Sequence, residues 1–228
     1  MQLPTEVPVM TLSNVILFPQ AMLPLYIFEP RYRRMLRDAL AGERMFAVAM
    51  RRTDRVREVP VPVAGVGLIR ACVTHDDGTS HLVLQGLARA ELGKAVQTRP
   101  YRRHVIKPLS ATQEPSVEAD ALAGKVLELV SERLQLGFQG HATPPLPGLA
   151  EAAEADGDAP AVEAFRQVLK QLARQDTPEQ LVDLVSATLV PGVRERQVIL
   201  ETRNLEERLR HLIRFLREEI SRRRQQKS

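Results

Sequence analysis

The side chains best suited to metal binding or acid–base chemistry are the five histidines, His75, His81, His104, His141 and His211. None of them has the spacing of four residues that places two imidazoles on one helix face to bind zinc. Two of them, His75 and His81, flank a predicted hairpin and are close enough in sequence to meet across it. We interpret this pair as a surface contact, and we predict no metal site in the chain.

Two Gly-Lys pairs come closest to a phosphate-binding loop, which needs an earlier glycine and a final hydroxyl residue at fixed spacing. At Gly93 and Gly124 the earlier glycine is replaced by alanine, and the hydroxyl residue by Ala95 or Val126. The chain has no Gly-x-Ser-x-Gly motif, and none of its five lysines has a recognisable nucleophile context. We therefore predict no catalytic residues and no cofactor, with a hydrolase of distant catalytic partners as a minor alternative.

The composition is that of an ordinary globular protein, because 44% of the 228 residues are hydrophobic and 26% are charged. No stretch approaches the roughly 18 uninterrupted apolar residues of a membrane span. No Lys or Arg precedes Arg31, so the charged start of a signal peptide is missing. The one cysteine, Cys72, forms neither an intramolecular disulfide nor a structural zinc site. We expect a cytoplasmic protein that does not enter membranes.

Positive charge is concentrated in the first half of the chain. Residues 1–110 contain 16 Lys and Arg against nine Asp and Glu, whereas residues 111–228 contain 16 against 19. A basic lobe attracts nucleic acid or acidic partners, so nucleic-acid binding is an alternative function. The arginines form no long uninterrupted block, which favours an ordinary solvated surface.

The hydrophobic pattern changes its period near residue 112. Before that point, short apolar runs predict strands at Val7–Leu12, Met45–Met50, Val63–Thr74, His81–Gln85 and Tyr101–Pro108. Asp77-Gly78 between two of these runs predicts a hairpin, and we interpret Gly65 and Gly67 as bends in the sheet. A proline near its start and Gly42 at its end predict one helix near residues 30–41.

After residue 112 the apolar residues recur with helical spacing. The Gly- and Pro-rich segment at about 137–160 predicts a flexible loop. Thr177 predicts the capped start of one helix, and Asn204 that of a long amphipathic helix. We therefore predict an α+β protein with a β-rich lobe over residues 1–112 and an all-helical lobe over residues 113–228.

One proline-containing stretch is more specific than these periodicities. It reads Leu12-Ser-Asn-Val-Ile-Leu-Phe-Pro19, followed by Leu23-Pro-Leu-Tyr-Ile-Phe-Glu-Pro-Arg-Tyr32. This phrase closely resembles the N-terminal substrate-binding domain of Lon proteases. Further matches to that family follow in order, at Gly65-Val-Gly67, Asp77-Gly78, Val83–Arg89 and Glu207–Leu209.

The resemblance implies a PUA-like pseudo-barrel followed by a helical bundle, and a role in recognising unfolded or damaged proteins. In the full protease this domain precedes an ATPase and a Ser-Lys peptidase. The chain is too short for both and contains no phosphate-binding loop, so we expect a free-standing relative of the domain.

The same motif supplies candidate binding residues. Its three prolines, Pro19, Pro24 and Pro30, stiffen a strongly apolar segment. That segment either buries itself against the barrel or rims a groove for extended apolar peptide. The candidate peptide-binding residues are Phe18, Met22, Leu23 and Tyr26. The predicted function is non-enzymatic binding of unfolded or exposed apolar polypeptide, as an adaptor or holdase that also contacts a protease or chaperone.

Overall fold

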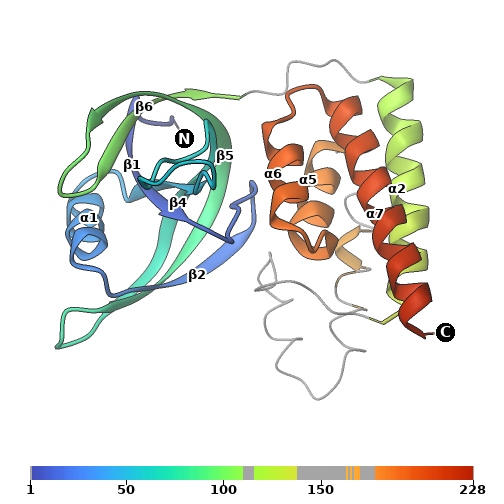
Figure 1. Ribbon diagram of the computed structural model, residues 1–228, viewed down its shortest axis with the longest axis horizontal. Coiled ribbons are helices and arrows are strands. Elements are labelled where there is room, and N and C mark those ends of the chain that lie inside the picture. Colours follow the sequence, from blue (N-terminus) through green and yellow to red (C-terminus); the bar gives the residue numbers. More distant parts are fainter. Residues whose placement is uncertain are drawn as a thin grey trace. The chain divides into compact units, whose positions relative to one another are not determined.

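The computed structural model describes residues 2–109, 116–137, 163, 165, 167–169 and 178–227 (Figure 1). The chain forms two compact units, Met1–Ser110 and Ala111–Ser228, which are considered separately below. In the described residues the first unit contains all the strands and one helix, and the second consists of helices. The predicted α+β class is therefore confirmed.

A closed sheet forms most of the first unit. Its elements are β1 (Glu6–Leu12), β2 (Met22–Ile27), α1 (Pro30–Ala41), β3 (Met45–Met50), β4 (Val63–Thr74), β5 (Ser80–Gln97) and β6 (Arg102–Pro108). The strand order is β2-β5-β4-β3-β1-β6, and β6 also pairs with β5. Because β6 pairs with both β1 and β5, five strands close into a barrel, and β2 extends the sheet along the first half of β5 (Figure 1).

Small apolar side chains fill the barrel. Along most of each strand, successive side chains point alternately into the barrel and away from it, as the pleat requires. The inward residues form one buried cluster: Val7, Val9, Ala47, Ala49, Ala64, Val66, Ala90 and Ile106. Four of these eight are alanines, which suits the narrow interior of a small barrel.

The predicted hairpin between β4 and β5 is confirmed. Gly78 has a φ of 78°, and its N–H donates to the carbonyl oxygen of His75 at 2.8 Å. The apolar run predicts a strand over His81–Gln85 and the family resemblance carries it to Arg89, whereas β5 continues to Gln97 through several register shifts. Sequence analysis also predicts no strand at β2, which forms with Pro24 within it because an outer strand tolerates a missing N–H.

Two glycines allow the segment before β2 to lie directly on the barrel wall. A Cβ on Gly65 would lie 1.9 Å from the carbonyl oxygen of Leu17, and one on Gly86 would lie 1.9 Å from that of Phe18. The N–H of Gly86 also donates to the carbonyl oxygen of Ala21 at 2.8 Å. The interpretation of Gly65 as a bend is therefore incomplete, because it is the close approach of a second backbone that requires glycine.

The second unit is helical throughout its described part. Its longer helices are α2 (Val117–Gln135), α5 (Pro178–Leu189), α6 (Val193–Glu201) and α7 (Leu205–Lys227). The predicted cap of the last helix is confirmed, since Asn204 Oδ1 accepts from the N–H of Glu207 at 2.8 Å. Nearly all of the predicted loop at 137–160, and Thr177, lie outside the described residues. Within those residues, no helix combines the length and hydropathy that crossing a bilayer requires.

Candidate functional site

Strands β2, β5 and β4 expose one face of their sheet to solvent. The strand register places Tyr26 beside His81, and His81 beside Val73, so these three side chains project from the same face. Tyr26 is 50% exposed and Val73 is 61% exposed. On the opposite face, Ile27 and Leu82 are buried. The sheet therefore has an ordinary core side and an unusually apolar solvent side.

A hollow of about 420 Å³ lies on this apolar solvent side. Its lining includes Pro24, Tyr26, Ala71, Val73, His81 and Val83. Contiguous exposed apolar groups commonly mark a binding site, whereas single ones need no explanation. We refer to these six residues as the apolar face.

Two rings of the apolar face, those of Tyr26 and His81, form a row of four with the rings of Phe28 and His75. The ring centroids of Phe28 and Tyr26 are 5.8 Å apart, and those of Tyr26 and His81 are 4.7 Å apart. The predicted approach of the two histidines is confirmed, because Nε2 of His75 lies 2.8 Å from Nδ1 of His81. Within the described part of the chain, no third ligand joins them to form a metal-binding cluster. The row holds Tyr26 in place, and a preorganised surface loses less entropy on binding.

The four predicted binding residues differ in their exposure and in the side of the sheet on which they lie. Tyr26 lies on the apolar face, and Met22 is half-buried on the same side of β2. Leu23 is half-buried on the other side of that strand. Phe18 is fully buried, so it belongs to the core and its side chain cannot contact a ligand. We therefore leave Phe18 out of the candidate surface.

Sequence reasoning missed the contributions of β4 and β5 to this surface. If the two strands are paired outward from the turn at Gly78, Val73 faces His81. The hairpin signal alone would therefore have placed these two side chains side by side. Nothing local pairs Tyr26 with His81, because β2 and β5 are separated by more than fifty residues of chain. The surface is therefore a product of long-range pairing.

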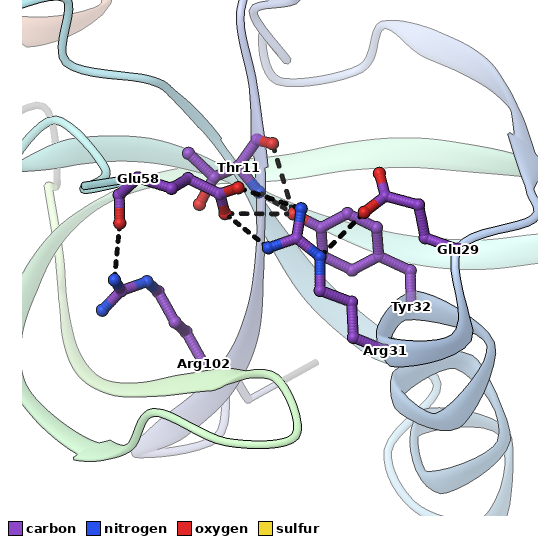
Figure 2. Close-up of polar contacts among 6 residues, drawn as sticks. All are labelled: Thr11, Glu29, Arg31, Tyr32, Glu58 and Arg102. Carbon is purple, nitrogen blue, oxygen red and sulfur yellow. Dashed lines mark hydrogen bonds and ion pairs between the residues drawn. The ribbon is translucent and has the colours of Figure 1, made fainter. Parts of the chain in front are cut away.

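The polar end of the same motif has a structural role. Arg31 Nε donates to Glu29 Oε2 at 2.9 Å, and its Nη1 donates to Glu58 Oε1 at 3.0 Å (Figure 2). The Tyr32 hydroxyl donates to the carbonyl oxygen of Thr11 at 3.2 Å and accepts from its N–H at 3.1 Å. These contacts fix the start of α1 against β1 and the segment around Glu58.

Burial and charge shift two pKa values in this network. Burial raises the pKa of the Tyr32 hydroxyl, and the nearby carboxylate of Glu58 raises it further. Burial lowers the pKa of Arg31, but the hydrogen bonds to Glu58 and Glu29 outweigh it and raise that pKa above its usual value. Arg31 therefore stays charged and acts as a clamp, which is not the behaviour of a proton donor.

Comparison with known proteins identifies the family. The model for the substrate-binding domain of ATP-dependent protease La (Lon) matches residues 6–218. The chain belongs to this family. The Lon protease of Desulfosudis oleivorans is 25% identical over 224 residues, which are 96% of this chain and 24% of that protein. Lon protease 1 of Thermus thermophilus is 25% identical over 222 residues, 95% of this chain and 25% of that protein.

The chain spans about a quarter of the length of the Lon proteases that it matches.

Two solved structures of Lon N-terminal domains share their fold with this chain. The N-terminal domain of the Mycobacterium avium complex Lon protease superposes with a TM-score of 0.65 and 19% identity, covering 92% of this chain and 97% of that one. The Lon N-terminal domain protein from Xanthomonas campestris gives 0.59 and 19%, covering 92% and 98%.

Proposed function

We propose that this chain is a non-enzymatic module that binds unfolded or partly unfolded polypeptide on the apolar face of β2, β5 and β4. The observation that carries the proposal is the exposure of Tyr26 and Val73 around one apolar hollow. Membership of the Lon substrate-binding domain family supports polypeptide as the class of ligand. In this role the module is an adaptor that presents clients to a protease or chaperone, or a holdase.

The chemistry of the apolar face suits clients of varied sequence. Apolar burial is non-directional, so it needs no fixed pattern of hydrogen bonds in the client. Burying ~400 Å² of apolar area has a gross transfer free energy of about 10 kcal/mol. Ordering and association costs offset most of this, so we expect affinities from roughly millimolar to micromolar.

The experiment is a titration of the whole chain with a labelled, reduced and unfolded protein. Val73→Ser and Tyr26→Ser each remove apolar area from the face, so each weakens binding by about fivefold or more. The matched control is Val96→Ser, which changes a 44% exposed valine on β5 that does not line the hollow. Unchanged affinity in Val73→Ser and Tyr26→Ser, or an equal loss in Val96→Ser, contradicts the proposal.

Salt dependence separates this function from nucleic-acid binding, the alternative suggested by the basic first unit. Apolar binding keeps its strength as salt is raised, whereas binding to nucleic acid falls steeply because counterions are released. A single-stranded oligonucleotide is titrated under the same conditions. Tight oligonucleotide binding with a steep salt slope, together with absent polypeptide binding, would favour the alternative.

A further inference from the structure

A second cavity lies elsewhere in the first unit and has a different chemical character. Its volume is about 210 Å³, and it shares no lining residue with the apolar hollow. The charged residues that line it are Arg31, Arg57, Glu58 and Arg102. Three cationic side chains therefore border this cavity with one anionic side chain.

The single carboxylate is already engaged. Glu58 Oε1 accepts from Arg31 Nη1 at 3.0 Å, and Glu58 Oε2 lies 2.9 Å from Arg31 Nη2. This is the two-pronged geometry in which a guanidinium saturates a carboxylate. Glu58 thus compensates Arg31, and the charges of the other two arginines remain.

Those two arginines have no carboxylate partner among the described residues. Arg102 donates from Nη2 to the backbone carbonyl oxygen of Glu58 at 2.5 Å, which is a neutral acceptor (Figure 2). Arg57 is exposed and, within the described part of the chain, forms neither a hydrogen bond nor an ion pair. Two guanidinium groups with donors to spare therefore border the same small cavity.

We propose that this cavity binds a phosphate group, as free phosphate or a phosphate monoester, between Arg57 and Arg102. A phosphate carries a charge of about −1.5 to −2 at neutral pH, which matches two uncompensated guanidinium groups. A carboxylate carries half of that charge and offers fewer acceptor oxygens. Thr98, which also lines the cavity, adds a hydroxyl donor.

The surroundings strengthen the attraction. The segment before Glu58 carries three further arginines against one carboxylate, Asp54, which pairs with two of them, and Arg99 lies next to Thr98 in the chain. Clustered charges of one sign raise the local concentration of oppositely charged ligands and their association rate. The fork of donors on Arg102 and Arg57 then distinguishes a bound phosphate from a diffuse counterion.

The test is calorimetric titration of the whole chain with inorganic phosphate, phosphoserine and acetate at fixed ionic strength. We expect one saturable phosphate site of roughly millimolar affinity or tighter, with acetate bound much more weakly. Equal binding of phosphoserine would extend the site to monoesters, and its failure would restrict it to the free anion. Arg57→Gln and Arg102→Gln should each weaken phosphate binding by about tenfold or more, because each removes charge-assisted hydrogen bonds.

The matched control is Arg55→Gln, which removes the same charge from the same segment but does not line the cavity. An equal loss in Arg55→Gln shows a diffuse basic surface and overturns the proposal. Absence of saturable phosphate binding also overturns it, as does oligonucleotide binding without phosphate binding. Arg57→Gln removes no contact within the described residues, so it stays informative even if Arg102→Gln destabilises the fold.

Discussion

The two units depart from ordinary burial mainly in different directions, although the first unit also buries Arg89 and the second also exposes Val117. The first unit places large apolar side chains in water, among them Tyr26, Val73 and Phe28, the last at 58% exposure. The second unit places charged side chains in its core, where Arg133 and Arg208 are fully buried. Both arrangements cost free energy, because water is unfavourable for apolar groups and a dry core is unfavourable for charges.

The two fully buried arginines of the helical unit both have ion-pair partners. Arg208 on α7 forms ion pairs with Asp183 and with Glu179, the latter at 3.2 Å, on α5. Arg133 on α2 lies 3.7 Å from Glu219 on α7, and burial lowers the pKa of Arg133 to about 10. These pairs join helices that are distant in sequence, and buried polar contacts of this kind can specify which helices pack together.

The exposed apolar groups of the barrel unit have no equivalent structural account. They do not fill a core, and the chain gains no folding free energy from leaving them in solvent. The comparison therefore assigns different meanings to two unusual features. The buried charges of the second unit are structural, and the apolar face of the first unit is the surface that we propose for binding.

The largest predicted effect tests the structural role of the buried charges. Arg208→Ala removes a fully buried cation from two ion pairs, so it should destabilise the protein by about 3–5 kcal/mol. The control Arg210→Ala affects an exposed pair with Glu118 and should cost less than about 1 kcal/mol. The measurement is chemical denaturation followed by helical circular dichroism. Equal stability in the two variants would show that burial does not distinguish these arginines.

A second prediction tests the tightest packing of the barrel unit. Gly65→Ala places a Cβ against the backbone of Leu17, so strand and segment must separate, at a cost of about 3 kcal/mol. The chain has no tryptophan and its three tyrosines are Tyr26, Tyr32 and Tyr101, so tyrosine fluorescence reports on the first unit alone. A fluorescence transition unchanged from that of the unmodified chain would show that the segment before β2 is loosely held.

The same glycine shows how far sequence reasoning reaches. The hairpin at Gly78, helix α1 and the cap at Asn204 follow from neighbouring residues, so local patterns predict them. The approach of Leu17 to Gly65 joins segments almost fifty residues apart, and no local pattern contains it. The next residue, Phe18, lies with its backbone against Gly86 in the same long-range packing, and its side chain is buried. A motif rich in apolar residues therefore did not reveal which of them are exposed.

The apolar face shows the same boundary. Alternation within β2 predicts that Met22 and Tyr26 share a side of the strand, but the side that meets solvent depends on pairing with β5. The cavity at Arg57 could not be predicted from the sequence for a further reason. Its charge balance depends on the ion pair between Arg31 and Glu58, which are 27 residues apart in the sequence.

A third prediction concerns the polar network at the start of α1. Tyr32→Phe removes the hydroxyl that satisfies both backbone groups of Thr11, so it should cost about 1–2 kcal/mol at neutral pH. Tyr26→Phe, on the exposed face, is the control and should leave stability nearly unchanged.

The pH dependence of stability sharpens this test. Burial, followed by the charge of Glu58, raises the pKa of Tyr32 in the folded state. Folding therefore favours the protonated hydroxyl, whose stabilising contribution is complete below the unfolded pKa of about 10 and is lost as pH rises through the folded pKa. Stability measured across this alkaline range should fall less steeply in Tyr32→Phe than in the unmodified chain. An identical pH slope would show that Tyr32 does not titrate differently in the fold.

The smallest predicted effect applies the same chemical change, glycine to alanine, to the other unit. Gly124 lies inside α2, and a Cβ built there meets nothing within 4 Å. Glycine in a helix interior is less favourable than alanine by about 0.5–1 kcal/mol, because it loses more backbone entropy on folding. Gly124→Ala should therefore stabilise the helical unit by that amount, seen as a later helical circular-dichroism transition, whereas Gly65→Ala destabilises the barrel. Destabilisation by Gly124→Ala would mean that another part of the chain packs closely against α2 at that point.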